Sequence, residues 1–309
     1  MKNLKNIFIV IYFCLVSVSI AGSYAPPAGQ AGSTAIYKDS NSFDAWATNI
    51  MIERGFQDIS NQTSEYAYFG SDANALYIAE GTSDDVVSLG DGGVATLTFD
   101  DSIYITNGEG YDFAVFENSF NDTFLELALV EVSSDGVNFF GFDAISLTPT
   151  NKQVNGFGNL DTINIHNLAG KYRRGYGTPF DLAELKDTSE LLDVNSITHV
   201  RIIDVVGYVE PADFYGDGVV NFIDFSIFVA AYPSKVGDEN WNVDCDISNP
   251  PNGIIDFDDF QIFMDKWLNE NDYSSCDING HQINDPWPTE FYTGGFDLDA
   301  VGVINAKLR

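Results

Sequence analysis

Positively charged residues are scarce in this chain. Its 309 residues include 14 lysines and arginines against 46 aspartates and glutamates, and the formal net charge is −32. A polyanion of this strength repels nucleic acids and anionic membrane surfaces, so neither is an expected partner. It attracts hard cations, above all calcium, which prefers oxygen ligands. Acidic residues can also simply solvate a surface, and their spacing along the chain has to distinguish the two explanations.

Histidine is almost absent, and this absence removes several kinds of catalytic site. His166, His199 and His281 are the only three, and none stands in a zinc-binding spacing such as HExxH. The chain also lacks the G-x-S-x-G motif of a serine nucleophile. The residues therefore give no direct indication of an enzyme, and catalysis is the less favoured interpretation.

Long apolar runs are absent after the N-terminal segment. The one such run, residues 7–20, follows Lys2 and Lys5 and precedes two small-x-small patterns that end at Ala21 and Ala25. It is short for a membrane span, which needs roughly 18 to 20 apolar residues. These features predict a secretory signal peptide over residues 1–25 and an exported mature protein without a membrane span, either secreted or at the cell surface. An uncleaved N-terminal anchor is the alternative.

Cysteine is nearly absent from the predicted mature chain. Cys14 lies within the apolar run, whereas Cys245 and Cys276 flank a carboxyl-rich segment. In an oxidising compartment, two cysteines that bracket one small element are typical of a disulfide. We therefore expect a bond between Cys245 and Cys276.

The acidic residues of that segment belong to an internal repeat. Residues 217–232 match residues 252–267, with Gly218 equivalent to Gly253. In each copy, apolar residues follow at i, i+3, i+4 and i+7, which is one face of a helix. Neither helix is long enough to be stable alone, so we expect the two faces to pack together. The faces comprise Phe225, Phe228, Val229 and Tyr232 in the first copy, and Phe260, Phe263, Met264 and Trp267 in the second.

The loops before these helices have the spacing of EF-hand calcium loops, with oxygen ligands at positions 1, 3, 5, 7, 9 and 12 and glycine at 6. The second loop fits when two residues are inserted around Pro250-Pro251. Tyr215 is a poor ligand, so either water or a backbone group replaces it or the first site is weaker. An acidic loop whose aspartate merely caps a helix is the alternative. The predicted ligands are Asp213, Tyr215, Asp217, the Val219 carbonyl, Asn221 and Asp224, then Asp246, Ser248, Asn252, the Ile254 carbonyl, Asp256 and Asp259.

The segment from about Asp213 to Leu268 resembles a type I dockerin, whose signature is a duplicated calcium loop that ends in aspartate and leads into a helix. The resemblance implies two bound calcium ions, calcium-dependent folding and docking onto a cohesin module of a scaffold or cell-surface protein. In that family the two residues after position 9 help to set partner choice. They are Phe222 and Ile223 in the first loop, and Phe257 and Asp258 in the second.

The remainder of the chain reads as a mainly β protein. Short β-rich runs recur between turn residues, and many short strands of this kind are typical of a sandwich or jelly roll. We expect one helix over residues 42–54, a β-sandwich domain over 26–207, an inserted α-helical calcium-binding domain over 208–276, and a closing strand within 277–309. The expected strands are Val94–Phe99, Asp112–Glu117, Leu125–Val132, Val137–Phe142, His199–Val206 and Gly294–Ile304, with a hairpin turn at Ser133–Gly136.

Several segments of this β-rich part resemble exported bacterial cell-surface β-sandwich proteins. They are DFAVFEN, FLELALVEVSSDGVNF, NLAGKYRRGYGTPFDL and GFDLDAVGVI. The VEVSSDGVNF hairpin and the FDLDAV strand also resemble discoidin-like, galactose-binding-type jelly rolls. The resemblance implies a fold and leaves the activity open.

Three groups of polar residues are candidates for a site in this part. A carboxylate pair for glycoside hydrolysis would come from Asp112, Glu117, Glu126 and Glu131, although strand alternation sends Glu126 and Glu131 to opposite faces. A further, structural calcium ion would use Asp112, Glu117, Asp297 or Asp299. The basic segment Lys171–Tyr176 would bind a sugar or an acidic partner. Solvated acids, and a basic loop that packs on its own sheet, are the alternatives.

The residues support three interpretations of function. The leading one is a non-catalytic, exported adhesion or binding protein with a glycan-binding sandwich and a docking module. The second is a polysaccharide-degrading enzyme that carries the module as an assembly tag. The third is a surface protein in which calcium has a purely structural role.

Overall fold

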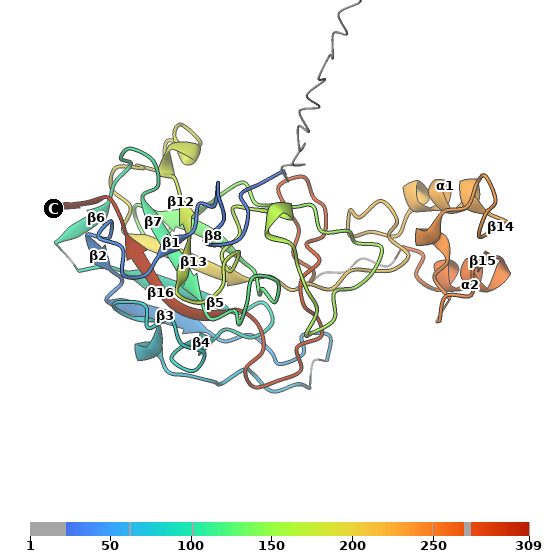
Figure 1. Cartoon of the computed structure of the whole chain (residues 1–309), viewed down its shortest axis with the longest axis horizontal. Coiled ribbons are helices and arrows are strands. Elements are labelled where there is room, and N and C mark those ends of the chain that lie inside the picture. Colours follow the sequence, from blue (N-terminus) through green and yellow to red (C-terminus); the bar gives the residue numbers. More distant parts are fainter. Residues whose placement is uncertain (1–22, 62, 101, 249, 269–272, 309) are drawn as a thin grey trace, which may run out of the picture.

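Two antiparallel sheets contain most of the regular structure in the computed structural model (Figure 1), which describes residues 23–61, 63–100, 102–248, 250–268 and 273–308. The first sheet has the order β1 (Ile36–Tyr37), β12 (Tyr176–Phe180), β7 (Phe113–Glu117), β16 (Asp297–Val303) and β2 (Ala45–Trp46), with β4 (Val87–Ser88) also paired to β16. The second has the order β3 (Asn49–Glu53), β5 (Val94–Thr98), β13 (His199–Asp204), β8 (Ala128–Ser133) and β9 (Phe140–Gly141). The expectation of a mainly β chain is confirmed.

Shorter strand pairs and single helical turns lie outside these two sheets. The additional pairs are β6 (Ile103–Ile105) with β17 (Ala306–Leu308), β10 (Ile145–Ser146) with β11 (Ile165–His166), and β14 (Ser234–Lys235) with β15 (Ile254–Ile255). Single 3-10 turns occur at Asp72–Ala75, Thr162–Asn164, Leu182–Leu185 and Val243–Cys245.

One hydrophobic cluster joins the two sheets. Val115 of β7 and Val301 of β16 lie in the same buried cluster as Leu97 of β5, Val130 of β8 and Ile202 of β13. Alternate residues of β5 and β13 are buried, as a sheet with one covered face requires. The sheets therefore face each other across this core, and their strand ends form the rims where loops gather.

The chain leaves the sheets after β13 and returns to them after a helical excursion, the segment between Val206 and Ser275. The amide of Ser275 donates to the Val206 carbonyl over 3.1 Å, and the amide of Val206 donates to the hydroxyl of Ser275 over 3.0 Å. The two ends of the excursion thus lie side by side. β16 then enters the first sheet between β7 and β2, so the C-terminal strand completes the fold that the N-terminal segments begin.

The excursion carries a pair of helices at the end of the molecule opposite the C-terminus (Figure 1). They are α1 (Phe222–Ala231) and α2 (Phe257–Asp265), and neither is long and apolar enough to cross a bilayer. The rings of Phe228 and Phe263 stack at 5.5 Å in the centre of the pair. Val229 and Met264 were expected on the packed faces, but they are 49% and 45% exposed.

The helix expected over residues 42–54 is wrong, because this segment forms β2 and β3. Every residue of β3 pairs with β5. Ile50 is buried, Met51 is 61% exposed and Ile52 is half-buried, which is the alternation of a strand. Pairing with β5 overrides the local helical pattern, since strand preference depends on neighbours that the local sequence does not contain.

The adjacent ends of the excursion predict that it can be removed. Replacing residues 210–272 with Gly-Asn-Gly keeps Tyr208 and Tyr273, whose rings lie 5.7 Å apart, and should leave one cooperative unfolding transition. We expect its midpoint to lie within about 5 °C of the corresponding transition of the full chain, a change of roughly 1 to 2 kcal/mol. Thermal unfolding followed by circular dichroism provides the measurement. Loss of cooperative unfolding would show that the sheets need the helical pair.

Candidate calcium loops and acidic pocket

Two buried carboxylates close the loop that precedes α1. Asp213 is 4% exposed and Asp224 is fully buried. The Asp213 carboxylate accepts a hydrogen bond from the amide of Gly218 over 2.6 Å. The Asp224 carboxylate accepts from the amides of Tyr215 and Asn221 over 2.9 and 2.8 Å. The loop therefore wraps its amide groups around acidic oxygens.

These acidic oxygens converge on one position. One carboxylate oxygen from each of Asp213, Asp217 and Asp224 lies within 4.8 Å of the other two. Two oxygens that bind one calcium ion at about 2.4 Å also lie within about 4.8 Å of each other. Burial, together with the nearby charges of Asp224 and Asp217, raises the pKa of Asp213 to about 6. A cation at this position would offset that repulsion, so the donor set fits calcium.

The loop before α2 repeats the same hydrogen bonds. The two-residue insertion around Pro250 makes Asp246 equivalent to Asp213 and Asp259 equivalent to Asp224. Asp246 accepts from the amide of Gly253 over 2.8 Å, as Asp213 does from Gly218. Asp259 accepts from the amides of Ser248 and Asp256, both over 2.9 Å. Two more hydrogen bonds are equivalent. The Asn252 side chain accepts from the amide of Ile254, as Asp217 does from Val219. The Asp256 side chain accepts from the amide of Asp258, as Asn221 does from Ile223.

The two loops carry the same number of predicted ligand carboxylates, placed at different positions. Position 5 is Asn252 where the first loop has Asp217, and position 9 is Asp256 where the first loop has Asn221. Position 3 is Ser248, whose hydroxyl donates to Asp246 over 3.1 Å. Amide, hydroxyl and carboxylate oxygens are all calcium ligands, so the two donor sets are comparable in charge.

A helix cap alone does not account for these loops. The last aspartate of each loop does cap its helix, since Asp224 and Asp259 complete capping boxes with Asn221 and Asp256. A cap needs only that local bond. The second oxygen of Asp224 reaches back across the loop to the amide of Tyr215. Each loop is thereby folded into a closed ring.

Two of the predicted ligand groups need separate comment. The ring of Tyr215 is 51% exposed and lies edge-on to His281 at 6.1 Å, so the side chain points out of the loop and leaves position 3 to water or a backbone group. The Val219 carbonyl accepts a hydrogen bond from the side-chain amide of Asn221 over 3.0 Å. Both groups predicted at positions 7 and 9 thus lie together.

The four predicted partner residues are exposed in the first turns of the helices. Phe222 is 75% exposed, Ile223 is 45% and Phe257 is 57%, and Asp258 is also exposed. The ring of Phe222 contacts Trp267 edge-on at 5.0 Å. None of these side chains belongs to the core of the helical pair, so they are available to a partner.

The disulfide expected between Cys245 and Cys276 is absent, and both residues are free thiols. Cys245 is buried with Phe228, Ala231 and Ile255 in the core between the helices, and burial raises its pKa to about 12. Cys276 is exposed beyond the helical pair, where its backbone bridges to Gln282. Both cysteines flank the same repeat in sequence, yet Cys245 lies inside the core of the helical pair and Cys276 lies outside it.

The four carboxylates expected to form a calcium site within the sheets are not all in one place. Asp112 accepts from the amides of Gly108 and Leu182, both over 2.7 Å, and Asp299 accepts from the amides of Glu80 and Gly81. Each of these two carboxylates ties down a loop. Glu117 and Asp297, however, lie close together. Burial raises the pKa of Glu117, and the negative charge of Asp297 raises it further.

Glu117 and Asp297 belong to a larger group of buried acids at one end of the two sheets. Burial is the main cause of a raised pKa in every member, and neighbouring carboxylates add to it in most of them. The pKa rises to about 8 in Asp204, about 7 in Asp297 and about 6 in Asp91. The group consists of Asp91, Glu117, Glu126, Asp204, Asp285 and Asp297.

Glu126 and Asp297 open into a pocket of about 220 Å³ that is lined by four phenylalanines. Glu131, by contrast, lies half-buried on β8 and pairs with Arg201 over 3.0 Å, so the two glutamates do point apart. Gly170 supports the turn beside Glu126, because its φ of +79° is unfavourable for other residues and a Cβ there would lie 1.8 Å from the Glu126 carbonyl oxygen. The lining rings are Phe120, Phe124, Phe157 and Phe291.

The basic segment Lys171–Tyr176 contacts the protein's own groups. Lys171 donates to the Ile165 carbonyl over 2.6 Å, and burial lowers its pKa to about 8. Arg173 pairs with Asp122, and Arg174 bonds Ser83. The segment therefore packs on its own sheet, and Lys171, although only 4% exposed, also lines an open space beside the N-terminal segment.

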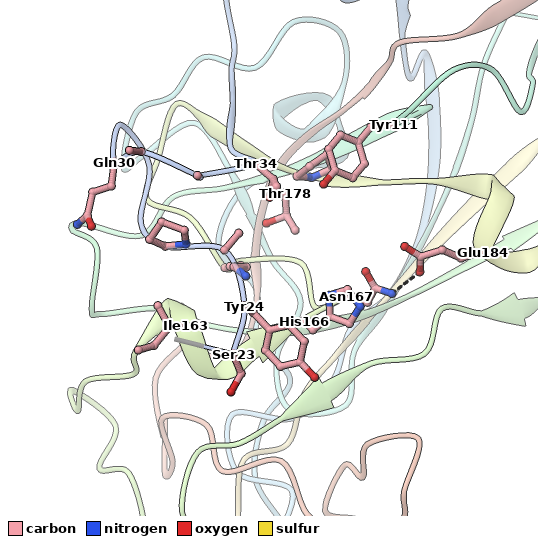
Figure 2. Close-up of a pocket in the computed structure, with 16 residues that line it drawn as sticks. Ser23, Tyr24, Gln30, Thr34, Tyr111, Ile163, His166, Asn167, Thr178 and Glu184 are labelled. Atoms are coloured by element: carbon pink, nitrogen blue, oxygen red, sulfur yellow. Dashed lines mark hydrogen bonds between the residues drawn. The ribbon is translucent and has the colours of Figure 1, made fainter. Parts of the chain in front are cut away.

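That space is a groove of about 870 Å³ between the N-terminal segment and the sheets. Figure 2 shows Tyr24 lying against His166, and the rings stack at 4.7 Å with an angle of 2°. Asn167 reaches Glu184 on the same wall. The groove is thus formed in part by the last residues of the predicted signal peptide, Ser23, Tyr24 and Ala25, and by the residues that follow them.

No protein-family model matches this chain, and searches of curated proteins and of solved structures found no match either.

Neutralising Glu126 should stabilise the ligand-free protein in a pH-dependent way. Its pKa is raised by burial and by the charges of Asp297 and Glu117, so its stabilising, protonated form is lost as the pH rises through that raised pKa. Glu126→Gln should raise the melting temperature by about 2 to 4 °C at about pH 8.5, the effect of roughly 1 kcal/mol, and have little effect near pH 5. Thermal unfolding at both pH values tests this.

The matched control is Glu109→Gln, because Glu109 is exposed. It should change the melting temperature equally little at both pH values. A Glu126→Gln protein that melts below the unmodified protein at about pH 8.5 would contradict the assignment of Glu126 as an uncompensated buried acid.

Proposed function

We propose that this protein is an exported, non-catalytic binding protein in which a calcium-dependent, dockerin-like module is inserted in a discoidin-like jelly roll. The observation that carries the proposal is the repetition of one hydrogen-bond set in two loops. Asp213 with Asp224, and Asp246 with Asp259, bind equivalent amides around an oxygen-lined centre. A repeat of this detail favours a shared ligand over two unrelated helix caps.

Calcium would order the helices through the same residues that close the loops. Asp224 and Asp259 each bond an amide early in the loop and an amide at the start of the helix. An ion held by these carboxylates would couple loop closure to helix capping. Helices as short as α1 and α2 are marginal alone in water, so we expect the module to lose structure without the ion.

The docking surface would be the first turns of the two helices. Phe222, Ile223 and Phe257 expose apolar area beside the acidic Asp258. Exposed aromatic residues are the commonest anchors of protein interfaces. We assign them a cohesin-type module as the partner, on the strength of the dockerin-like loops to which they are attached.

Calcium titration of the full chain tests the loops directly. After removal of calcium with EDTA, calorimetry should detect two ions per chain. Asp224→Asn and Asp259→Asn should each weaken one site by about tenfold or more, since each loses a charged ligand. Asp258→Asn is the matched control and should retain both sites. Absence of calcium binding by the unmodified chain would end the proposal.

Partner capture tests the docking surface separately. Purified cohesin modules, immobilised on a sensor, should bind the full chain in calcium and release it in EDTA. Phe222→Ser and Phe257→Ser should each weaken binding by about tenfold or more, as for interface anchors, while calcium binding stays unchanged. Val236→Ser is the control, because Val236 is also 67% exposed but lies between the helices in sequence. Equal binding by all variants, or binding in EDTA, would refute the assignment.

The N-terminal groove favours one of the two cleavage positions. Tyr24 stacks on His166, and its amide donates to the Ile163 carbonyl over 3.1 Å. Cleavage after Ala25 would remove these contacts, whereas cleavage after Ala21 keeps them. Mass spectrometry of the mature N-terminus should therefore find a chain that begins at Gly22. A chain that begins at Pro26 would show that the groove is wider in the mature protein.

A further inference from the structure

The pocket beside β16 combines an apolar rim with an acidic wall. The rings of Phe120 and Phe124 stack at 5.4 Å, Phe124 lies 6.1 Å from Phe157, and Phe157 lies 5.6 Å from Phe291. Phe120, Phe157 and Phe291 are 57%, 73% and 44% exposed. Exposed phenylalanines in a continuous row are unusual in a protein with so strongly charged a surface. They surround the opening through which Glu126 meets the solvent.

Glu126 has no partner of its own in the described residues. It is 9% exposed, and no hydrogen bond or ion pair reaches its carboxylate from any residue that the structure describes. Asp297 differs, because its oxygens accept from Ser88 and from Asn118. A buried carboxylate without a partner is costly in either protonation state, since the charge is unpaired and the protonated group has no acceptor. A ligand in the pocket would supply the missing partner.

The surrounding charges determine what kind of ligand fits. The carboxylates of Asp297, Glu117, Asp285 and Asp204 all act on Glu126. Arg54 is near enough to act on Asp297, but its guanidinium donates to the carbonyls of Phe69, Gly70 and Ser88. Each of these carboxylates therefore disfavours the negative charge of Glu126, and the Arg54 guanidinium is directed at carbonyl groups. A neutral sugar would leave this charge in place, whereas a cation would offset it.

The shape of the site favours an organic cation over a metal ion. Within the described residues, the acidic oxygens that converge as closely as one ion requires are those of Asp213, Asp217 and Asp224, and the pocket carboxylates are not among them. Aromatic rings attract ammonium and guanidinium groups through their faces. The pocket volume of about 220 Å³ is below the range of roughly 300 to 1,000 Å³ typical of sites for whole small molecules. One side chain or a slender amine fits it.

We propose that this pocket binds an organic cation, with a primary ammonium or guanidinium group reaching Glu126 and its aliphatic stem lying between the phenylalanine rings. Asp297 contributes a second negative charge, and Phe157 is the most exposed part of the rim. The site is separate from the calcium loops and does not depend on them. A lysine or arginine side chain of another protein and a free amine share this chemistry.

Calorimetry on the full chain tests the proposal, with calcium saturating and about 150 mM salt to screen non-specific attraction to the acidic surface. The probes are 1,5-diaminopentane, N-acetyl-lysine amide and glucosamine, and 1,5-pentanediol is the neutral match. The amines should bind, and the diol should not. Tightest binding of the lysine derivative would assign the pocket to a protein side chain, and tightest binding of diaminopentane or glucosamine would assign it to a free amine or amino sugar.

Variants locate the binding. Glu126→Gln keeps the size of the side chain, removes the charge and should weaken the amine by about tenfold or more. Phe157→Ala should weaken it by about threefold, and Glu109→Gln should leave it unchanged. Unfolding of each variant by circular dichroism verifies that it is folded. Unaltered amine binding by Glu126→Gln, equal binding of the diol, or no amine binding by the unmodified chain would each overturn the proposal.

Discussion

Carboxylates buried without matching cations are the constraint on which the rest of this structure depends. Asp213 and Asp224 are held in one loop, Asp246 and Asp259 in another, and Glu126 in a pocket at one end of the sheets. Backbone amides stabilise the four loop carboxylates through hydrogen bonds, but they do not cancel their charge. With a formal net charge of −32, the chain has few basic side chains to do so. We therefore propose that external cations stabilise this fold.

The two regions meet this constraint differently. In the loops, amide groups surround the acidic oxygens. In the first loop, the oxygens of Asp213, Asp217 and Asp224 also converge closely enough for a single hard ion. In the pocket, the acids are spread more widely and apolar rings border the opening. One arrangement suits calcium and the other a cationic group on an organic stem. The loops pack against the hydrophobic clusters of the helical pair, whereas the pocket lies at one end of the sheets.

The parts of this account that were predictable from sequence are the local ones. The hydrogen-bonded loops before the two helices follow from spacing within a dozen residues, and the insertion at Pro250 preserves the hydrogen bonds of Asp246 and Asp259. For residues 49–53 the local sequence predicts a helix, whereas the structure has a strand, because its partner β5 is distant in sequence. The prediction of a disulfide is wrong because sequence spacing does not show which residues the core encloses. Cys245 lies inside the helical core, and Cys276 lies outside it.

The acidic pocket was not predictable as a site. Glu126 was considered as a catalytic carboxylate, but the phenylalanines around it come from three separate segments that only the folded chain brings together. An exposed Phe157 looks like any other loop residue in the sequence. Its place beside the pocket emerges from its ring contacts with Phe124 at 6.1 Å and Phe291 at 5.6 Å. Long-range assembly of this kind leaves no periodic pattern along the chain.

Hydrogen–deuterium exchange of the full chain, with calcium and with EDTA, tests the central claim most directly. The account predicts that calcium slows exchange of the amides in residues 213–224 and 246–259, which bond the buried aspartates, while the strands of the two sheets exchange equally in both conditions. Identical exchange of both loops with and without calcium would contradict it.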